Sequence, residues 1–280
     1  MKLSEVCAAG LDALKRGGVE DASFDCSCLF SDVFGMKRAE LFLHDGEAPR
    51  EKTDEFIEKI DMRVHGRPLQ YILGKWDFYD MTFFVGEGVL IPRPETETLV
   101  DIALSFIGER KGLRIFDLCT GSGCIGLTLA KKCPDCSFTL IDISPTALSF
   151  AEKNRSEYGL ENVSIAAYDI RDGFEETFFS DRPDVILSNP PYVPSGEIAS
   201  LQKEVRCEPS LALDGGESGL GYYHVIADKW LPYLGKYGFA AVECGEGQAE
   251  RISALFSPFG ETCVVRDAFG AYRFVTVNAS

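Results

Sequence analysis

From Leu113 onward, short apolar runs typical of buried strands alternate with stretches of helical periodicity. Because neighbouring parallel strands need a crossover between them, this alternation predicts a parallel, doubly wound sheet, an α/β fold with helices on both faces. Two final runs flank Phe269-Gly270 and predict a hairpin that adds an antiparallel edge, for seven strands in all. The expected strands are 113–117, 137–141, 163–167, 185–187, 239–243, 262–266 and 272–277, and the expected helices are 124–132, 145–158, one that ends at 231–234, and 248–256.

The first part of the chain has a different pattern. Residues 1 to about 75 carry apolar side chains at helical spacing in four stretches, near 3–14, 22–34, 37–43 and 53–66. Aromatic residues then flank Asp80-Met81, which predicts a β-hairpin, and Thr96 is expected to cap the helix that follows. We therefore expect a helical domain at 1–75, a hairpin and proline-rich linker at 76–95, and the α/β domain at 96–280.

A glycine-rich turn follows the first expected strand of the α/β domain. Gly121-Ser122-Gly123-Cys124-Ile125-Gly126 matches the dinucleotide-binding fingerprint, and Asp142 lies about 20 residues further on, where an acid binds ribose hydroxyls. A lone match of this kind is weak, since the glycines could be plain turn residues and Asp142 a helix cap. A nicotinamide or flavin oxidoreductase is one interpretation of this turn.

Three features favour S-adenosylmethionine over a dinucleotide. Asp117 ends the first strand, where a carboxylate would crowd a pyrophosphate but could pair with a cationic amino-acid end. No second crossover unit for a nicotinamide half is evident, and the fourth strand ends in a motif without hydride chemistry. Ligands bind at the carboxyl ends of such strands, so Asp169 and Ile170 are candidates to contact the adenosine, with Asp172 as the alternative to Asp169.

The strand at 185–187 ends in Ser188-Asn189-Pro190-Pro191-Tyr192. Proline has a fixed φ and no N–H, so this loop is stiff and presents carbonyl acceptors beside the Asn189 amide. The Asn189 side-chain oxygen and the Pro190 carbonyl could hold both hydrogens of a planar NH2 group, while Tyr192 lies against it. Aiming the nitrogen at an electrophile in this way is worth up to roughly 7–11 kcal/mol of barrier. The plainer interpretation is a strand-end turn with no chemistry.

Composition narrows the class of protein. The formal net charge is −16, and no Lys or Arg run suggests a nucleic-acid surface. No apolar span is long enough for a membrane helix and no signal-peptide pattern opens the chain, so we expect a cytoplasmic protein. The ten cysteines are expected to be reduced thiols, and we expect no metal, because no second pair follows Cys133-Pro134-Asp135-Cys136.

With these residues in hand, the chain resembles the protein-(glutamine-N5) methyltransferases of the HemK/PrmC family. The resemblance covers nearly the whole chain. Asn-Pro-Pro-Tyr alone is shared with many amino-methyltransferases, whereas the Ile-Pro-Arg-Pro-Glu-Thr-Glu stretch behind a helical front unit is far more specific. The matching segments are 67–74, 90–100, 117–123, 142–144, 188–192, 208–209 and 212–216.

The resemblance implies a class I methyltransferase fold, Rossmann-like, behind a helical domain that recognises the substrate. It implies transfer of a methyl group from S-adenosylmethionine to the side-chain amide of the Gln in the Gly-Gly-Gln motif of class 1 peptide chain release factors. S-adenosylhomocysteine would be left, and translation termination would be modulated. Two positions depart from the family pattern: Cys119 stands where the family often has Gly, and Gly126 where it usually has a small residue such as Ala.

This resemblance and the positions of the residues at strand ends together suggest roles for individual residues. Asn189, Pro190 and Tyr192 would be catalytic, and Pro191, Arg93 and Glu95 would join them in binding the substrate. The cofactor would contact Asp117, Cys119, Thr120, Gly121, Ser122, Gly123, Asp142, Ile143, Asp169, Ile170 and Asn189.

The sequence is also compatible with two other functions. An N6-adenine methyltransferase would use the same clamp on an exocyclic NH2 group, but it needs base flipping and a basic path for the nucleic-acid backbone. A binding module that holds S-adenosylmethionine without turnover would have no use for Asn189 and Tyr192. We expect the chain to act as a monomer.

Overall fold

A computed structural model of the chain describes residues 1–279 and divides them into two compact units. The first contains Met1–Lys75 and the short segment Gln202–Cys207, and the second contains Trp76–Leu201 and the chain from Glu208 onward. The segment at 202–207 therefore belongs to the helical unit, although it lies far along the chain.

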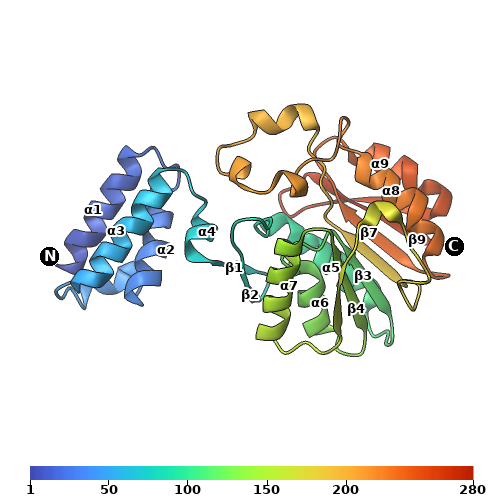
Figure 1. The fold of residues 1–280 in the computed structure, drawn as a ribbon, viewed down its shortest axis with the longest axis horizontal. Coiled ribbons are helices and arrows are strands. Elements are labelled where there is room, and N and C mark those ends of the chain that lie inside the picture. The colour runs from blue at the N-terminus through green and yellow to red at the C-terminus, as the bar shows by residue number, and fades with distance from the viewer. Residues whose placement is uncertain (280) are drawn as a thin grey trace. The chain divides into compact units, whose positions relative to one another are not determined.

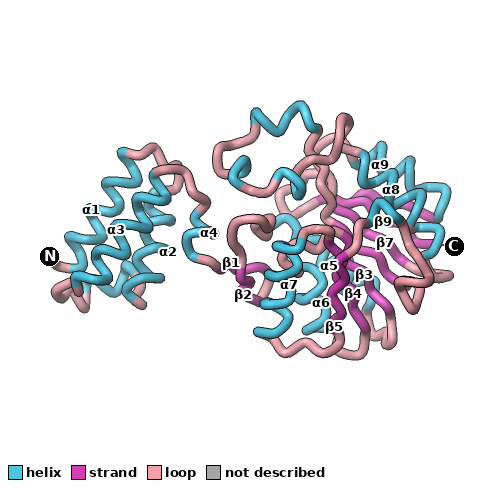
Figure 2. Tube along the Cα trace, viewed as in Figure 1, coloured by secondary structure: helices cyan, strands magenta, loops and turns pink. Residues whose placement is uncertain are grey.

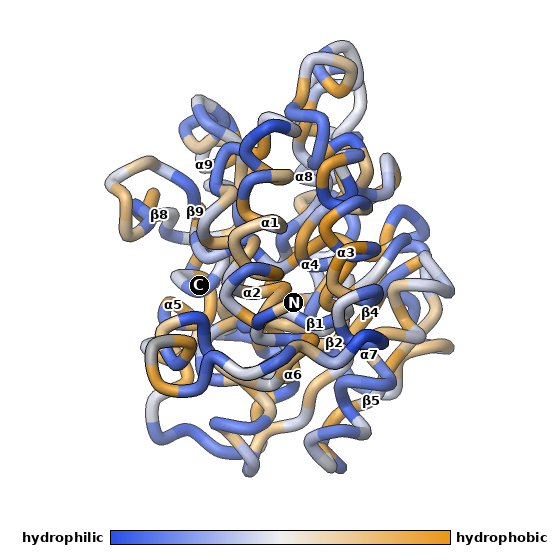
Figure 3. Tube along the Cα trace, turned by 90° about the vertical axis from the view of Figure 1, so that its left-hand side faces the viewer, coloured by the Kyte–Doolittle hydropathy of each residue, from blue (hydrophilic) through white to orange (hydrophobic). Residues whose placement is uncertain are grey.

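Three helices form the core of the first unit: α1 (Leu3–Arg16), α2 (Ala22–Phe34) and α3 (Arg50–Val64). Their tubes change between apolar and polar colouring along their length (Figure 3), as amphipathic helices do. Helices α1 and α3 approach closely at Gly10, where a Cβ atom would lie 2.5 Å from the Phe56 ring. Two short helices complete the unit, η1 (Arg38–Phe42) and α4 (Leu69–Leu73). Helix α3 starts at Arg50 rather than Thr53, and the sequence pattern did not predict α4.

A buried arginine ties the distant segment to this unit. The Arg63 side chain on α3 is only 6% exposed, and its Nε donates to Asp25 Oδ2 of α2 at 2.5 Å. Its Nη2 donates to Glu204 Oε1, also at 2.5 Å. The Lys203 ammonium in the same segment donates to the His65 carbonyl at 3.1 Å. Two acids far apart in sequence are thus held together on one cation.

The second unit is built on a seven-stranded sheet with the order β5-β4-β3-β6-β7-β9-β8 (Figure 1). The pairings among the first five strands in this order are parallel, and β9 and β8 pair antiparallel. The predicted fold class, a mostly parallel sheet with an antiparallel C-terminal hairpin, is confirmed. The strands are β3 (Arg114–Leu118), β4 (Ser137–Asp142), β5 (Val163–Ala167), β6 (Val185–Ser188), β7 (Phe239–Glu243), β8 (Gly260–Arg266) and β9 (Tyr272–Ala279).

Helices cover both faces of this sheet (Figure 2). One face packs on α5 (Glu97–Ile107) and α6 (Cys124–Lys132), and α7 (Pro145–Glu157) lies beside them. The other face packs on α8 (Gly221–Lys229) and α9 (Ala249–Phe256), around the buried ring of Trp230. The helix expected to end at 231–234 is α8, which ends at Lys229 and is followed by a short turn, η7 (Leu231–Tyr233).

The predicted hairpin forms from β1 (Lys75–Phe78) and β2 (Met81–Phe84), and its Phe78, Met81 and Phe83 side chains join the core under α5 and α6. Short 3-10 turns make up the remaining elements: η2 (Pro94–Thr96), η3 (Ile170–Asp172), η4 (Ser195–Ser200), η5 (Val205–Cys207), η6 (Ser210–Ala212) and η8 (Ser257–Phe259). Within residues 1–279, no helix is both long and apolar enough to cross a membrane.

Strand order determines where a ligand can bind. The chain winds outward in one direction through β3, β4 and β5, and then in the other direction through β6 and β7. The order therefore reverses between β3 and β6, and the carboxyl ends of parallel strands beside such a switch point form the binding crevice of this class of sheet. The register pairs Leu118 with Ser188, so the glycine turn and Asn189 emerge side by side.

Candidate functional site

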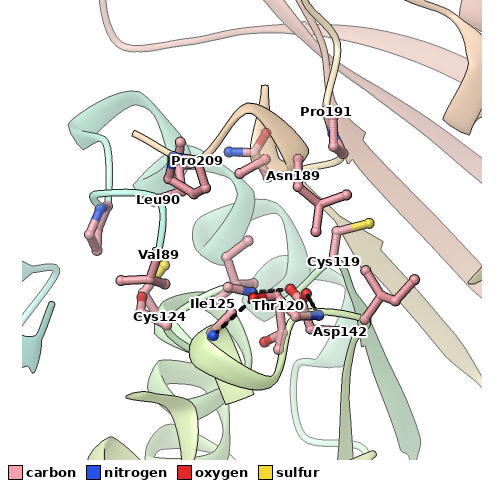
Figure 4. Close-up of a pocket in the computed structure, with 18 of the residues that line it drawn as sticks. Val89, Leu90, Cys119, Thr120, Cys124, Ile125, Asp142, Asn189, Pro191 and Pro209 are labelled. Atoms are coloured by element: carbon pink, nitrogen blue, oxygen red, sulfur yellow. Dashed lines mark hydrogen bonds between the residues drawn. The ribbon is translucent and has the colours of Figure 1, made fainter. Parts of the chain in front are cut away.

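A pocket in the second unit opens at this switch point (Figure 4). It contains about 900 Å³ of empty space, part of it open to solvent. The glycine turn, the end of β4, the turn after β5 and the motif after β6 all contribute to its walls. Of the residues predicted from sequence, it is lined by Arg93, Cys119, Thr120, Gly121, Ser122, Asp142, Ile143, Asp169, Ile170, Asn189 and Pro191.

The glycine turn after β3 has a left-handed backbone at three places, with φ of 59° at Cys119, 58° at Gly121 and 83° at Gly123. Glycine adopts this region readily and other residues do not. A glycine would therefore adopt the backbone of position 119 at lower cost than the Cys119 present in this chain. A Cβ on Gly121 would meet only Val89 Cγ2, at 3.9 Å, so the space beside this backbone is open to a ligand.

Asp142 at the end of β4 braces the glycine turn. Its Oδ2 accepts the Gly121 N–H at 2.9 Å, and its Oδ1 accepts the Ser144 N–H at 2.9 Å. Burial raises the pKa of this carboxyl, against the opposing effect of nearby backbone N–H groups. A carboxylate can accept about four hydrogen bonds, so two backbone donors leave capacity for two hydroxyls of a ribose.

Asp117 is predicted to contact the cofactor but does not line the pocket. It is fully buried, and its Oδ2 accepts the Thr120 hydroxyl at 2.6 Å and the Gly126 N–H at 3.0 Å. Its Oδ1 has no hydrogen-bond partner among the described residues, and burial raises its pKa to about 7. Asp117 thus supports the pocket through Thr120, which is a lining residue, and direct pairing with a cationic ligand stays a prediction.

Gly126 has a packing role in the same turn. A Cβ there would lie 2.7 Å from Leu140 Cδ1 and 3.0 Å from Asp117 Oδ2. An alanine at this position would therefore need Leu140 or Asp117 to shift in this chain.

Some residues of the Asn-Pro-Pro-Tyr motif after β6 line the pocket, and others lie behind its wall. Asn189 and Pro191 line the pocket, whereas Pro190 is buried and Tyr192 is half-buried outside the lining. Gln248, beside the start of α9, donates from Nε2 to the Tyr192 carbonyl at 2.9 Å. Burial also raises the pKa of the Tyr192 phenol. The tyrosine is thus held in its neutral form, and contact of its ring with a substrate stays a prediction.

The turn after β5 brings Tyr168, Asp169 and Ile170 to the pocket, and Asp172 does not line it. Arg171 donates to both oxygens of Asp169, at 2.7 to 3.0 Å, and these hydrogen bonds lower the pKa of that carboxyl. Ile170 is 3% exposed, and its carbonyl accepts the Trp230 indole N–H at 2.8 Å. The apolar side chain of Ile170 is therefore held in place beside Asp169, whose carboxylate is already paired with Arg171.

Arg93 lines the pocket and Glu95 does not. The Arg93 Nη2 donates to Glu208 Oε1 at 2.5 Å, and the second oxygen of Glu208 accepts the Ile91 N–H at 3.0 Å. Glu208 is buried and so anchors the proline-rich stretch at both places.

Some lining residues were not predicted from sequence. The sequence pattern assigns Val89 and Leu90 to a linker, although an apolar pair before a rigid proline is a signal that could have identified them. Leu211 and Tyr222 come from segments without a motif. Thr96 is predicted to be a helix cap, yet the structure shows no capping bond from its side chain. Its hydroxyl instead donates to Glu243 at 2.6 Å, because the turn η2 leads directly into α5.

The pocket fits an adenosyl amino acid. The open backbone at Gly121 allows close approach, the Asp142 carboxylate has acceptor capacity for hydroxyls, and Ile170 offers an apolar contact. No group of three or more His, Cys, Asp or Glu residues that could hold a metal occurs within the described part of the chain.

Known proteins similar to this chain agree on one class. The family model described as PrmC N-terminal domain matches residues 5–74, and that described as Methyltransferase domain matches residues 109–214. The chain is 38% identical over 253 residues to a release factor glutamine methyltransferase of Thermodesulfovibrio yellowstonii, with 89% of each chain covered. It is 36% identical over 253 residues to the protein of that name in Geobacter sulfurreducens, covering 88% of this chain and 85% of the relative.

Two solved structures share the fold at low identity. The 16S rRNA N2 G1207 methyltransferase RsmC of T. thermophilus, in complex with AdoMet and guanosine, has a TM-score of 0.52 at 16% identity, covering 71% of this chain and 47% of that one. The catalytic domain of hMettl16 with an RNA hairpin has a TM-score of 0.57 at 13% identity, covering 82% of each chain. At these identities the likeness shows the fold alone.

Proposed function

This chain belongs to the release factor glutamine methyltransferases, and from that premise we propose that it methylates the side-chain amide of a glutamine in a peptide chain release factor, with S-adenosylmethionine as the methyl donor. The substrate is inferred to be the Gln of the Gly-Gly-Gln motif in class 1 release factors. We assign the reaction to the pocket at the switch point between β3 and β6.

One observation carries this assignment to the pocket: Asn189 projects from the end of β6 into the same pocket as the Gly121 turn and Asp142. When bound, S-adenosylmethionine supplies an electrophilic methyl group on a positively charged sulfur. Thr120, Gly121 and Asp142 would hold the amino-acid and ribose parts, and Ile170 would contact the adenine. Ser122, Cys119 and Ile143 would complete the walls.

The chain's own contribution to the transfer is positioning. The Asn189 side-chain oxygen and the Pro190 carbonyl would accept the two hydrogens of the substrate amide, with Pro191 and Tyr192 shaping the space around it. So held, the amide nitrogen would take the methyl group that S-adenosylmethionine supplies, with the bonding pair left on the sulfur, and would release one proton to solvent. Holding the reactants in line accounts for up to roughly 7–11 kcal/mol of barrier.

Methyl transfer from labelled S-adenosylmethionine to a purified release factor tests the function. We expect label on the factor, and no label when its Gly-Gly-Gln glutamine is replaced. Asn189→Ala should lower kcat about 100-fold with little change in cofactor affinity, because it removes one acceptor and misaims the nitrogen. Unchanged turnover in that variant would contradict the assigned mechanism.

Adenine-containing DNA in a parallel reaction tests the alternative of a nucleic-acid amino-methyltransferase. The net charge of −16 disfavours it, since backbone recognition needs clustered cations. Label on DNA alone would mean that the amide clamp is right and the partner is wrong.

The remaining assignments follow from this substrate. The first unit is proposed to recognise the release factor, with Arg93 and Glu95 contacting it beside the pocket. We expect the protein to act as a monomer in the cytoplasm, where release factors work, without a nucleic-acid or membrane partner.

A further inference from the structure

A buried acid lies next to Asn189. Glu243 ends β7, and the register pairs the preceding Val242 with Ser188 on β6. Glu243 is 0% exposed, and its Oε1 has no hydrogen-bond partner among residues 1–279. Burying a carboxylate at this place carries a cost that an apolar side chain would avoid.

Among the residues that the structure describes, the Glu243 side chain makes one hydrogen bond, and that bond leads toward the pocket. Its Oε2 accepts from the Thr96 hydroxyl at 2.6 Å, and Thr96 Oγ1 accepts from the Asn189 Nδ2 at 3.2 Å. Thr96 is 2% exposed and comes from η2, which is far from both partners in sequence. Three residues from three elements therefore form one chain of hydrogen bonds that ends at the site.

The direction of this chain is determined by proton count. A hydroxyl has a single hydrogen, and the ionised Glu243 carboxylate can only accept, so in that state Thr96 gives its hydrogen to Glu243. The lone pairs of the Thr96 oxygen are then left to face Asn189, and they can accept only from the NH2 end of its amide. An Asn side chain whose NH2 group is engaged on one side presents its carbonyl oxygen on the other.

We propose that Thr96 and Glu243 are positioning residues that fix the Asn189 amide with its oxygen toward the pocket, as the acceptor for the substrate NH2 group. This inference deepens the proposed function and rests on it for the identity of the substrate. Without Thr96 and Glu243, the Asn189 amide can rotate by half a turn and present its NH2 group to the pocket. That group is a donor, and it repels the N–H groups of the substrate amide that the Asn189 oxygen should accept.

Kinetics of matched variants test the proposal. Thr96→Val keeps the shape of the side chain and removes the hydroxyl, whereas Thr96→Ser keeps the hydroxyl. We expect Thr96→Val and Glu243→Leu to lower kcat by about 10- to 100-fold, because each removes the hydrogen bond between Thr96 and residue 243, with Thr96→Ser within a few-fold of wild type. The dissociation constant for S-adenosylmethionine should change little, which also shows that the variants are folded.

A double-mutant cycle separates positioning from general damage. If Thr96 acts through Asn189, then Thr96→Val should have no further effect on single-turnover rates once Asn189 is already alanine. Equal losses from Thr96→Val in both backgrounds, or wild-type kcat in Thr96→Val, would overturn the inference.

Side-chain NMR tests the orientation without any turnover. Asparagine-labelled protein carries four such amides, at Asn154, Asn162, Asn189 and Asn278, and Asn189→Ala identifies the resonances of interest. We expect one Asn189 Nδ2 proton to exchange slowly with solvent in wild type and Thr96→Ser, and rapidly in Thr96→Val. Equal exchange in all three would refute the positioning role even if the protein methylates release factors. Slow exchange without methyl transfer would instead count against the proposed function.

Discussion

Gly121 combines backbone freedom with contact to the pocket. Its φ is 58°, and an added Cβ would project toward open space, with Val89 Cγ2 at 3.9 Å as its nearest neighbour. We expect Gly121→Ala to lower the free energy of unfolding by about 1–2 kcal/mol, the cost of a left-handed non-glycine residue. It should also weaken S-adenosylmethionine binding at least about 10-fold, because the methyl group occupies space needed for close approach.

Gly159 provides a matched control for this substitution. Its φ is 60°, a Cβ added there would meet no atom within 4 Å, and it is not among the pocket residues. Gly159→Ala should lower stability by a similar amount and leave S-adenosylmethionine affinity at the wild-type value, as measured by denaturant unfolding and calorimetric titration. Equal affinities in the two variants would mean that Gly121 is only a turn residue.

At the residue scale, the sequence predicted 11 of the 26 residues that line the pocket, because glycine turns, strand-end acids and the Asn-Pro-Pro-Tyr motif are local signals. It did not indicate how Asp117 or Thr96 is used. Asp117 accepts a hydrogen bond from Thr120, and Thr96 donates one to Glu243. Both outcomes depend on contacts that a local pattern does not contain.

At the scale of elements, the buried Arg63 joins α2, α3 and the segment 202–207. Arg63→Met would leave Asp25, which is 4% exposed, without its cation. Removing one partner of a buried pair costs about 3–5 kcal/mol. We expect marked destabilisation of the first unit and faster tryptic cleavage after Lys203 and Arg206, because Glu204 loses its anchor.

The control lies on the same helix. Arg50 pairs with Asp54 at 3.9 Å, with side chains 95% and 70% exposed. Arg50→Met should change stability by less than about 1 kcal/mol and leave the cleavage rate unchanged. Similar behaviour of the two variants would show that Arg63 does not hold the segment.

Helices and strands were predicted well where apolar residues recur periodically in the sequence. They were predicted poorly where long-range contacts determine which unit a segment joins. All seven strands of the sheet and the three main helices of the first unit follow from apolar spacing. The place of 202–207 in the first unit does not, because it depends on long-range contacts such as the ion pair between Glu204 and Arg63 and the hydrogen bond from Lys203 to the His65 carbonyl. The short helix α4 has too few residues to show a period.

For the whole molecule, the buried acids Asp117 and Glu243 make stability depend on pH, and Asp25 and Asp142, whose pKa values burial also raises, act in the same direction. Burial raises the pKa of Asp117 and of Glu243 to about 7, from ordinary values of 3.8 and 4.5. At Glu243, hydrogen bonding by Thr96 and the charges of Arg273 and Arg93 lower the pKa, and the charge of Glu95 raises it further. At Asp117, hydrogen bonds from Thr120 and Gly126 lower the pKa, and the charge of Asp142 raises it further.

Between those ordinary values and pH 7, the folded chain keeps protons that the unfolded chain has released. The free energy of unfolding therefore falls as pH rises through this window and levels off above it. Carboxyls whose pKa is lowered, such as Asp184, act in the opposite direction but titrate below 3.8, outside the range from pH 5 to 8.

Urea unfolding of the ligand-free protein from pH 5 to pH 8 measures this effect. We expect wild type to lose stability by a few kcal/mol across the range, since each pKa unit corresponds to about 1.4 kcal/mol. Asp117→Asn and Glu243→Gln should each flatten the curve, because an amide does not titrate, and the double variant should flatten it most. Curves that stay parallel to wild type in both single variants would show that neither acid is protonated in the folded chain. In that case the Thr96 hydroxyl would face an ionised Glu243 over the whole range, and methyl transfer should show no loss of kcat from this acid as the pH falls from 8 to 5.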